Sequence, residues 1–137
     1  MKSFIKHGER GFWVNDSIMQ FVFAYLYCRF TVDDVFKEKS SFLELIKDNS
    51  LGYFASYMHL SLETELNENE RREFCLKIFI IVLELNNDEA QEIQLYDLCN
   101  YEEYKSIEYY LPKEIDKNTL IRYLLKLAYL CENYLRS

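Results

Sequence analysis

The sequence predicts an all-α fold, a single-domain bundle of about six to eight helices. Three observations favour this fold class. Only three glycines and one proline occur among 137 residues, and no Asn-Gly or Asp-Gly dipeptide marks a tight hairpin. Apolar residues instead recur at spacings of three and four, the helical period. Half of the residues are hydrophobic and 17% are aromatic, which suffices for a buried core.

Capping residues and apolar periodicity place the helices along the chain. We expect residues 1–14 to be a loosely ordered N-terminal segment of one domain that covers residues 1–137. Asn15 or Asp16 caps the first helix, Asn67 and Asp88 cap later ones, and Pro112 ends another. A strand at 107–111 is the alternative for part of this last helix, since Tyr109 and Tyr110 favour β-structure. The predicted helices cover residues 17–30, 31–36, a segment from about 41, 53–62, 68–85, 89–99, 101–110 and 118–135.

The cysteines indicate a reducing compartment. Cys28, Cys75, Cys99 and Cys131 form no CxxC pair and each lies in an apolar helical context, so we expect four buried free thiols. The chain shows no secretory signal, and its longest apolar stretch is well short of the roughly 20 residues that cross a bilayer. A cytoplasmic protein without membrane association is therefore predicted.

Motifs for catalysis and for cofactors are missing from the sequence. A nucleophile would need a nearby base, but His7 lies in the N-terminal segment, and His59 lies between Met58 and Leu60 as structural histidines often do. No GxSxG, Glu-x-x-His, calcium loop or glycine-rich phosphate loop occurs. We expect a protein that is not an enzyme and that binds neither a cofactor nor a metal.

The negative charge is concentrated in one quarter of the chain. The net charge is −7, yet residues 84–116 alone hold ten acidic residues against Lys105 and Lys113, a net of −8. The remaining residues are close to neutral. Five of the twelve tyrosines lie in the same stretch, and tyrosine is enriched at interface hot spots. This segment is either a solvated acidic face with tyrosines at the edge of the core, or a binding surface for a basic protein.

The binding hypothesis assigns charge complementarity to the acids and anchoring to the tyrosines. An acidic chain with a pI near 4.9 is not expected to bind nucleic acid, because phosphates are neutralised by Lys and Arg. The predicted partner-binding residues are Glu89, Glu92, Tyr96, Asp97, Tyr101, Glu102, Glu103, Tyr104 and Glu108.

The acidic run NNDEAQEIQLYDLCNYEEYKSIEYY and the aromatic helix SIMQFVFAYLYCRF resemble small helical immunity proteins of bacterial toxin–immunity pairs, such as those of contact-dependent growth inhibition. The resemblance is one of character across the whole chain and carries no diagnostic motif. It implies a cognate toxin domain as partner, often a nuclease with a basic cleft, which the immunity protein blocks without catalysis.

The alternative function is a helical regulator or adaptor that binds DNA through the C-terminal helix. That helix carries four cations against one acid, a net of +3. The four cations are Lys117, Arg122, Lys126 and Arg136, and the acid is Glu132.

Overall fold

The computed structural model describes residues 2–7, 10–52, 57–59, 66–99, 101–107 and 111–136. The described part is predominantly helical, as predicted, but it is not all-α, because it also contains two small sheets. It also has fewer α-helices than the six to eight helices expected. Its α-helices are α1 (Asp16–Phe30), α2 (Ser40–Leu51), α4 (Glu68–Asn87) and α5 (Lys117–Arg136), and its 3-10 helices are η1 (Leu95–Asp97) and η2 (Tyr101–Ile107). The strands are β1 (Lys2–His7), β2 (Arg10–Asn15), β3 (Tyr57–His59), β4 (Glu92–Gln94) and β5 (Glu114–Asp116).

The N-terminal segment is an antiparallel hairpin, so the prediction of loose order at 1–14 is wrong. Strands β1 and β2 pair in register from Lys2↔Asn15 to His7↔Arg10, with Ile5 and Val14 buried in the core. Gly11 is required by close packing, because a Cβ there would lie 2.1 Å from the Ile5 carbonyl oxygen.

The hairpin extends to a third strand that the sequence prediction placed in a helix. Strand β3 pairs in parallel with β1, from Phe4↔Tyr57 to Lys6↔His59, and gives the order β2-β1-β3. The helix predicted over 53–62 is therefore wrong at 57–59, and the rest of that prediction lies outside the described residues.

Helices α1 and α4 begin at the capping residues predicted for them. The side chain of Asn15 accepts a hydrogen bond from the Ser17 N–H at the start of α1. At α4, Asn67 and Glu70 form a reciprocal capping box. The short helix predicted at 31–36 does not form; residues 31–39 make turns, in which the Asp33 carboxylate accepts the N–H groups of Val35 and Phe36.

Aromatic side chains fill the centre of the molecule. Phe30, Phe36, Phe42 and Phe74 are buried, with ring centroids 4.9–6.5 Å apart. They come from α1, the turn segment, α2 and α4, so this cluster joins four parts of the chain. None of the helices in the described ranges is both long and apolar enough for a bilayer span.

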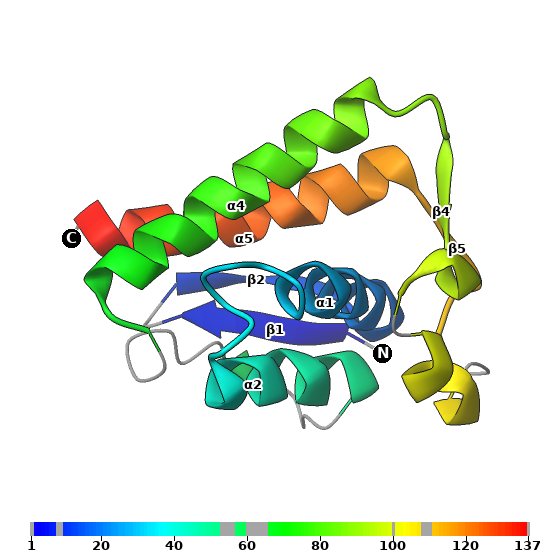
Figure 1. The fold of residues 1–137 in the computed structure, drawn as a ribbon, viewed down its shortest axis with the longest axis horizontal. Helices are drawn as coiled ribbons and strands as arrows, with labels where there is room; N and C mark the ends of the chain where they lie inside the picture. The colour runs from blue at the N-terminus through cyan, green and yellow to red at the C-terminus, as the bar shows by residue number, and fades with distance from the viewer. Residues whose placement is uncertain are drawn as a thin grey trace.

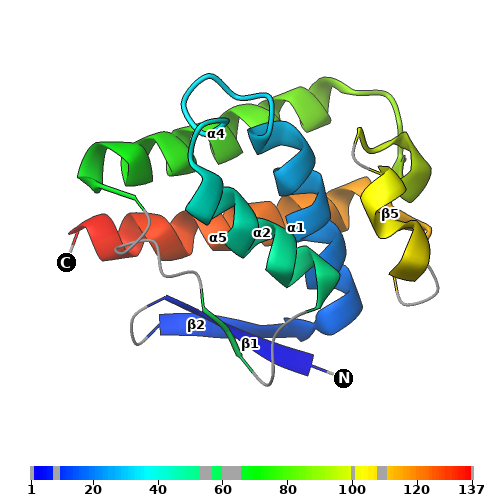
Figure 2. The ribbon, with the colours of Figure 1, turned by 60° about the horizontal axis from the view of Figure 1, so that its bottom comes forward.

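Helices α4 and α5 lie side by side in opposite directions (Figures 1 and 2). Helix α1 packs against α2 and also contacts α5 and β2, and α5 reaches β1 directly. The chain leaves the C-terminal end of α4, forms β4, η1, η2 and β5, and returns into α5 at the same end of the molecule. The described residues of 84–116 are thus brought together at one end of the molecule, which we call the acidic end.

Candidate functional site

A two-stranded antiparallel ribbon forms part of the acidic end. Strands β4 and β5 pair through Glu92↔Asp116, Ile93↔Ile115 and Gln94↔Glu114. Because side chains alternate between the two faces of a strand, the isoleucines turn inward and the charged residues turn outward. The helix predicted over 89–99 is therefore wrong: β4 and the 3-10 helix η1 take residues 92–97, and the flanking residues are irregular. Only three residues belong to each strand, which is too short for a clear sequence alternation.

The carboxyl groups of Glu92 and Glu114 hydrogen-bond with one another across this ribbon, and their pKa values shift in opposite directions. The pKa of Glu92 is raised above its ordinary value, first because its side chain hydrogen-bonds with Glu114 and then because of the negative charge of Glu114. The pKa of Glu114 is lowered, chiefly by a hydrogen bond from Gln94 Nε2 to its carboxylate at 2.7 Å. As the pH falls, Glu92 is the member of this pair that takes up a proton first.

The segment around η1 presents an exposed tyrosine over two buried leucines. Tyr96 is 64% exposed and Asp97 is also exposed, whereas Leu95 and Leu98 are buried. The backbone N–H of Leu95 donates to the Lys113 carbonyl at 2.8 Å. The buried Leu95 and Leu98 thus fix the backbone beside Tyr96, while the Tyr96 side chain is exposed to solvent. An exposed ring on a fixed backbone is what the predicted anchoring role requires.

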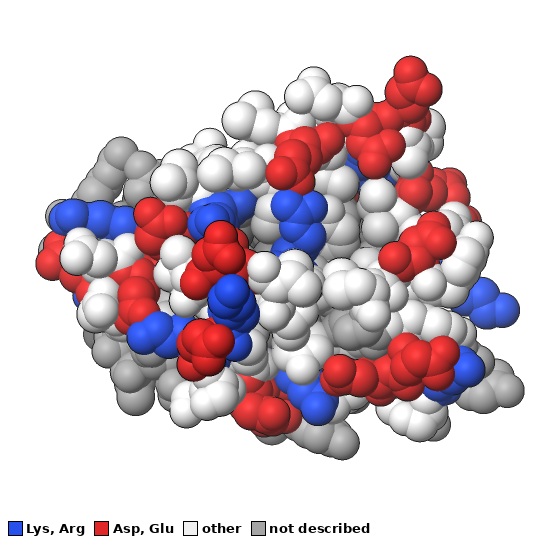
Figure 3. All heavy atoms as spheres, in the orientation of Figure 1, with Lys and Arg blue, Asp and Glu red and all other residues white. Residues whose placement is uncertain are grey.

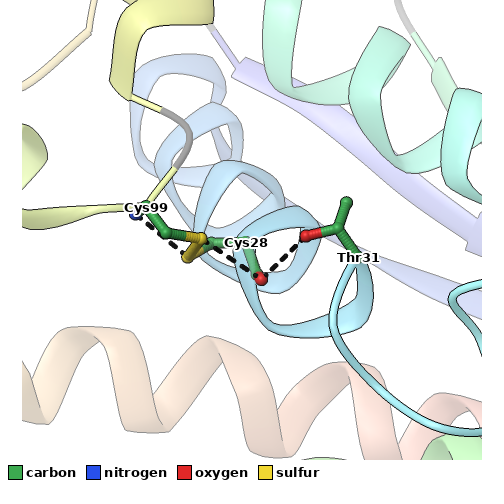
Figure 4. The surroundings of a disulfide bond; sticks show 3 residues. All are labelled: Cys28, Thr31 and Cys99. Carbon is green, nitrogen blue, oxygen red and sulfur yellow. Dashed lines mark hydrogen bonds between the residues drawn. A yellow bond between two sulfur atoms is a disulfide. The ribbon is translucent and has the colours of Figure 1, made fainter.

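A disulfide between Cys28 and Cys99 ties this segment to α1 (Figure 4). The Cα atoms are 5.7 Å apart, within the preferred range for a disulfide, and the Cys99 N–H donates to Cys28 Sγ at 3.1 Å. The expectation of free thiols is therefore wrong for Cys28 and Cys99, which are brought together from 71 residues apart. It is confirmed for Cys75 and Cys131, which are buried thiols outside any disulfide of the described residues.

Helix η2 contains Tyr104, a predicted contact residue that the structure places in the core. Tyr104 is completely buried, and its hydroxyl lies 2.6 Å from Ser50 Oγ on α2, so it packs in the core and cannot touch a partner in this structure. Ser50 Oγ also donates to the Lys47 carbonyl, so the tyrosine hydroxyl is the donor to Ser50. Tyr101 is partly buried. The helix predicted at 101–110 is a 3-10 helix up to residue 107.

The remaining predicted acids differ in how far neighbouring lysines neutralise them. Glu103 pairs with Lys47 at 3.4 Å, and its charge raises the pKa of that lysine. Glu102 makes an exposed pair with Lys105 at 3.2 Å. Glu89, Glu92 and Asp97 are exposed, and none of the three forms an ion pair with another residue that the structure describes. Glu108 lies outside the described residues, as do residues 108–110 of the strand considered over 107–111.

The charge distribution is uneven over the molecular surface. On the face drawn in Figure 3, red atoms predominate towards the right, where the acidic end lies in Figure 1, and blue and red atoms mix towards the left. Lys117, at the start of α5, is buried and donates from Nζ to the Asp88 carbonyl at 2.7 Å. It is therefore not one of the surface cations on which the alternative DNA-binding hypothesis relies. Arg122 and Lys126 are exposed, and Lys126 Nζ lies 5.3 Å from the centre of the Tyr123 ring.

A pocket of about 350 Å³ adjoins the acidic end and was not predicted. One side is an ion pair between Arg29 and Glu84 at 2.6 Å, and another is an ion pair between Lys77 and Asp33 at 3.0 Å. Its residues come from α1, the 31–39 turns and α4. No local sequence motif links these three segments, so only the fold reveals the pocket.

Metal-binding clusters and known relatives give no further guidance. Among the side chains that the structure describes, no group of three or more His, Cys, Asp or Glu could hold a metal ion. No family model, curated protein or solved structure matches this chain. Function is therefore inferred from the geometry of the molecule.

Proposed function

We propose that this protein is a non-catalytic immunity protein that binds and neutralises a basic, nuclease-type toxin domain through its acidic end. The observation that carries the proposal is the location of the negative charge on the molecule. Residues 84–116 have a net charge of −8 in the sequence, and those of them that the structure describes lie at one end of the molecule, where Glu89, Glu92 and Asp97 face solvent. A nuclease must hold phosphates with basic residues, so the surface that blocks it should be acidic.

The way the acidic end is held supports this role. The buried hydrogen bond of Tyr104 to Ser50 and the ion pair of Glu103 with Lys47 attach it to α2, whatever the redox state of Cys28 and Cys99. A surface fixed before binding loses less conformational entropy when the complex forms. Tyr96, projecting from this fixed base, supplies a stiff amphipathic anchor among the acids.

A cytoplasmic location is part of the proposal, because that is where a nuclease toxin would meet its nucleic-acid substrate. Disulfides are rare in that compartment. The redox state of Cys28 and Cys99 in the producing cell is therefore a direct test of the location: an oxidised pair would contradict it, and a reduced pair would support it.

Charge reversal tests the assignment of the acidic end. The variant carries Glu89→Lys, Glu92→Lys and Glu102→Lys, all at exposed positions. The matched control carries Glu38→Lys, Glu44→Lys and Glu68→Lys, which are also exposed and change the net charge equally. The probe is the C-terminal domain of the polypeptide encoded immediately upstream of this chain.

The two variants are predicted to separate in stopped-flow association at low salt. The acidic-end variant should associate at least about tenfold more slowly than the control, because electrostatic steering depends on local charge, and the difference should shrink at high salt. Equal association of the two variants would refute the acidic site. An upstream product that is neither toxic nor bound by this protein would refute the immunity function itself.

A further inference from the structure

Helix α4 exposes a row of apolar side chains on its outer surface. Leu76, Ile80 and Leu83 are 51%, 40% and 63% exposed, and their spacings of four and three place them on one helical face. Val32, 74% exposed, belongs to the neighbouring turns and lines the 350 Å³ pocket together with Ile80. We call these four residues the α4 patch. Large side chains exposed together in this way are typical of an interaction site.

The pocket beside the α4 patch is suited to an apolar group. Phe30 and Ile81 line it and are themselves buried in the core. The charged residues on its sides are already neutralised in pairs, Arg29 with Glu84 and Lys77 with Asp33. An ion entering the pocket would have to break one of these pairs, whereas an apolar side chain would leave both intact. Pockets of this kind accept the anchor residues of protein partners.

The extent of the α4 patch argues against a second copy of this chain as its occupant. Leu76 to Leu83 span only about 10 Å of helix, at 1.5 Å per residue. A stable dimer buries roughly 800 Å² on each partner, far more than a strip of this length offers. The α4 patch is therefore expected to be one section of a larger interface.

The acidic end supplies the rest of that interface. Glu84 lines the pocket and is also the first acid of the acidic segment, and the exposed Asp88 and Glu89 follow one helical turn later. The apolar and acidic surfaces are thus continuous at the C-terminal end of α4. A partner that covers both must present an apolar side chain next to basic residues.

We infer that the α4 patch and its pocket are a second docking element for the same basic toxin domain, which inserts a Leu-, Met- or Phe-like side chain between the two ion pairs. This inference rests on the proposed function. The interface then has two parts: the acidic end raises the association rate, and the α4 patch with its pocket lowers the dissociation rate.

The test replaces two exposed members of the α4 patch, Val32→Asp with Leu83→Asp, and measures binding to the upstream-encoded C-terminal domain. The control is Trp13→Asp, at a similarly exposed apolar residue on β2. Thermal unfolding of all variants verifies that they are folded. The α4 variant should dissociate at least about tenfold faster than wild type, with an association rate at low salt that changes much less. The control should dissociate at the wild-type rate.

The outcomes separate this inference from the proposed function. Wild-type dissociation of the α4 variant would overturn the inference, whatever the charge-reversal variant does. Faster dissociation of the α4 variant, together with unchanged association of the charge-reversal variant, would retain the α4 patch and refute the acidic site. Sedimentation of the free protein as a dimer that Leu83→Asp dissociates would overturn the inference in favour of a second copy.

Discussion

Removing the disulfide between Cys28 and Cys99 tests how the acidic end is attached to the helical body. The bond closes a loop of 71 residues that contains α2, α4 and β4. Opening that loop returns conformational entropy to the unfolded chain, and the loop-closure relation gives about 4 kcal/mol at 25 °C. We therefore expect Cys28→Ser with Cys99→Ser to lower the free energy of unfolding by about 4 kcal/mol. This is a large share of the stability of a typical domain.

Chemical denaturation measures this change. Urea unfolding curves of the oxidised wild type and of the double variant give the two free energies. The matched control is dithiothreitol, which should lower the stability of the wild type to that of the double variant and leave the double variant unchanged. A thiol count adds an independent check, because the denatured, unreduced wild type should expose only the thiols of Cys75 and Cys131.

Two results would refute this reasoning. Four reactive thiols in the denatured, unreduced protein would show that the disulfide does not form. A double variant within about 1 kcal/mol of the oxidised wild type would show that the loop is constrained by other contacts.

Two further substitutions probe the hydrogen bonds of Tyr104 and Asp33. Tyr104→Phe leaves Ser50 Oγ without its hydroxyl donor and should lower the free energy of unfolding in urea by about 1–2 kcal/mol. The control Tyr96→Phe, at an exposed ring, should lower it by almost nothing. Equal losses would contradict the burial of Tyr104. Burial opposes ionisation of Asp33, but hydrogen bonds from Lys77 and from backbone N–H groups outweigh it and lower its pKa below the ordinary 3.8. The carboxylate therefore stabilises the fold above about pH 4 and loses this effect as the pH falls through its lowered pKa. Asp33→Asn should reduce stability at pH 7, and the difference from wild type should shrink below pH 4; a difference that stays constant down to pH 2.5 would contradict the assignment.

The sequence predicted the helices whose signals are local. Asn15 and Asn67 cap α1 and α4 as expected, and the apolar period of α5 extends over five turns. The concentration of acidic residues in one stretch of chain was also evident from the sequence. The stretch folds back on itself at one end of the molecule because β4 pairs with β5.

The features that the sequence did not predict depend on distant contacts. Strands β4 and β5 have three residues each and are stable only because they pair with one another. Cys28 and Cys99 lie in ordinary helical and loop contexts, and nothing in their spacing marks them as partners. Tyr104 lies between the exposed Glu103 and Lys105 in the sequence, yet the 3-10 geometry of η2 turns its ring into the core. The α4 patch was overlooked because Leu76, Ile80 and Leu83 resemble core positions in a helix that is apolar on more than one side.

The central claim is that the acidic end is the surface that meets the partner. Hydrogen exchange of the free protein and of its complex with the upstream-encoded C-terminal domain measures this most directly, because it locates the backbone that binding protects. We predict that protection increases over 92–99 and 101–107 and along the exposed side of α4. Protection confined to the β1–β2 hairpin or to α5, with none at the acidic end, would contradict the claim.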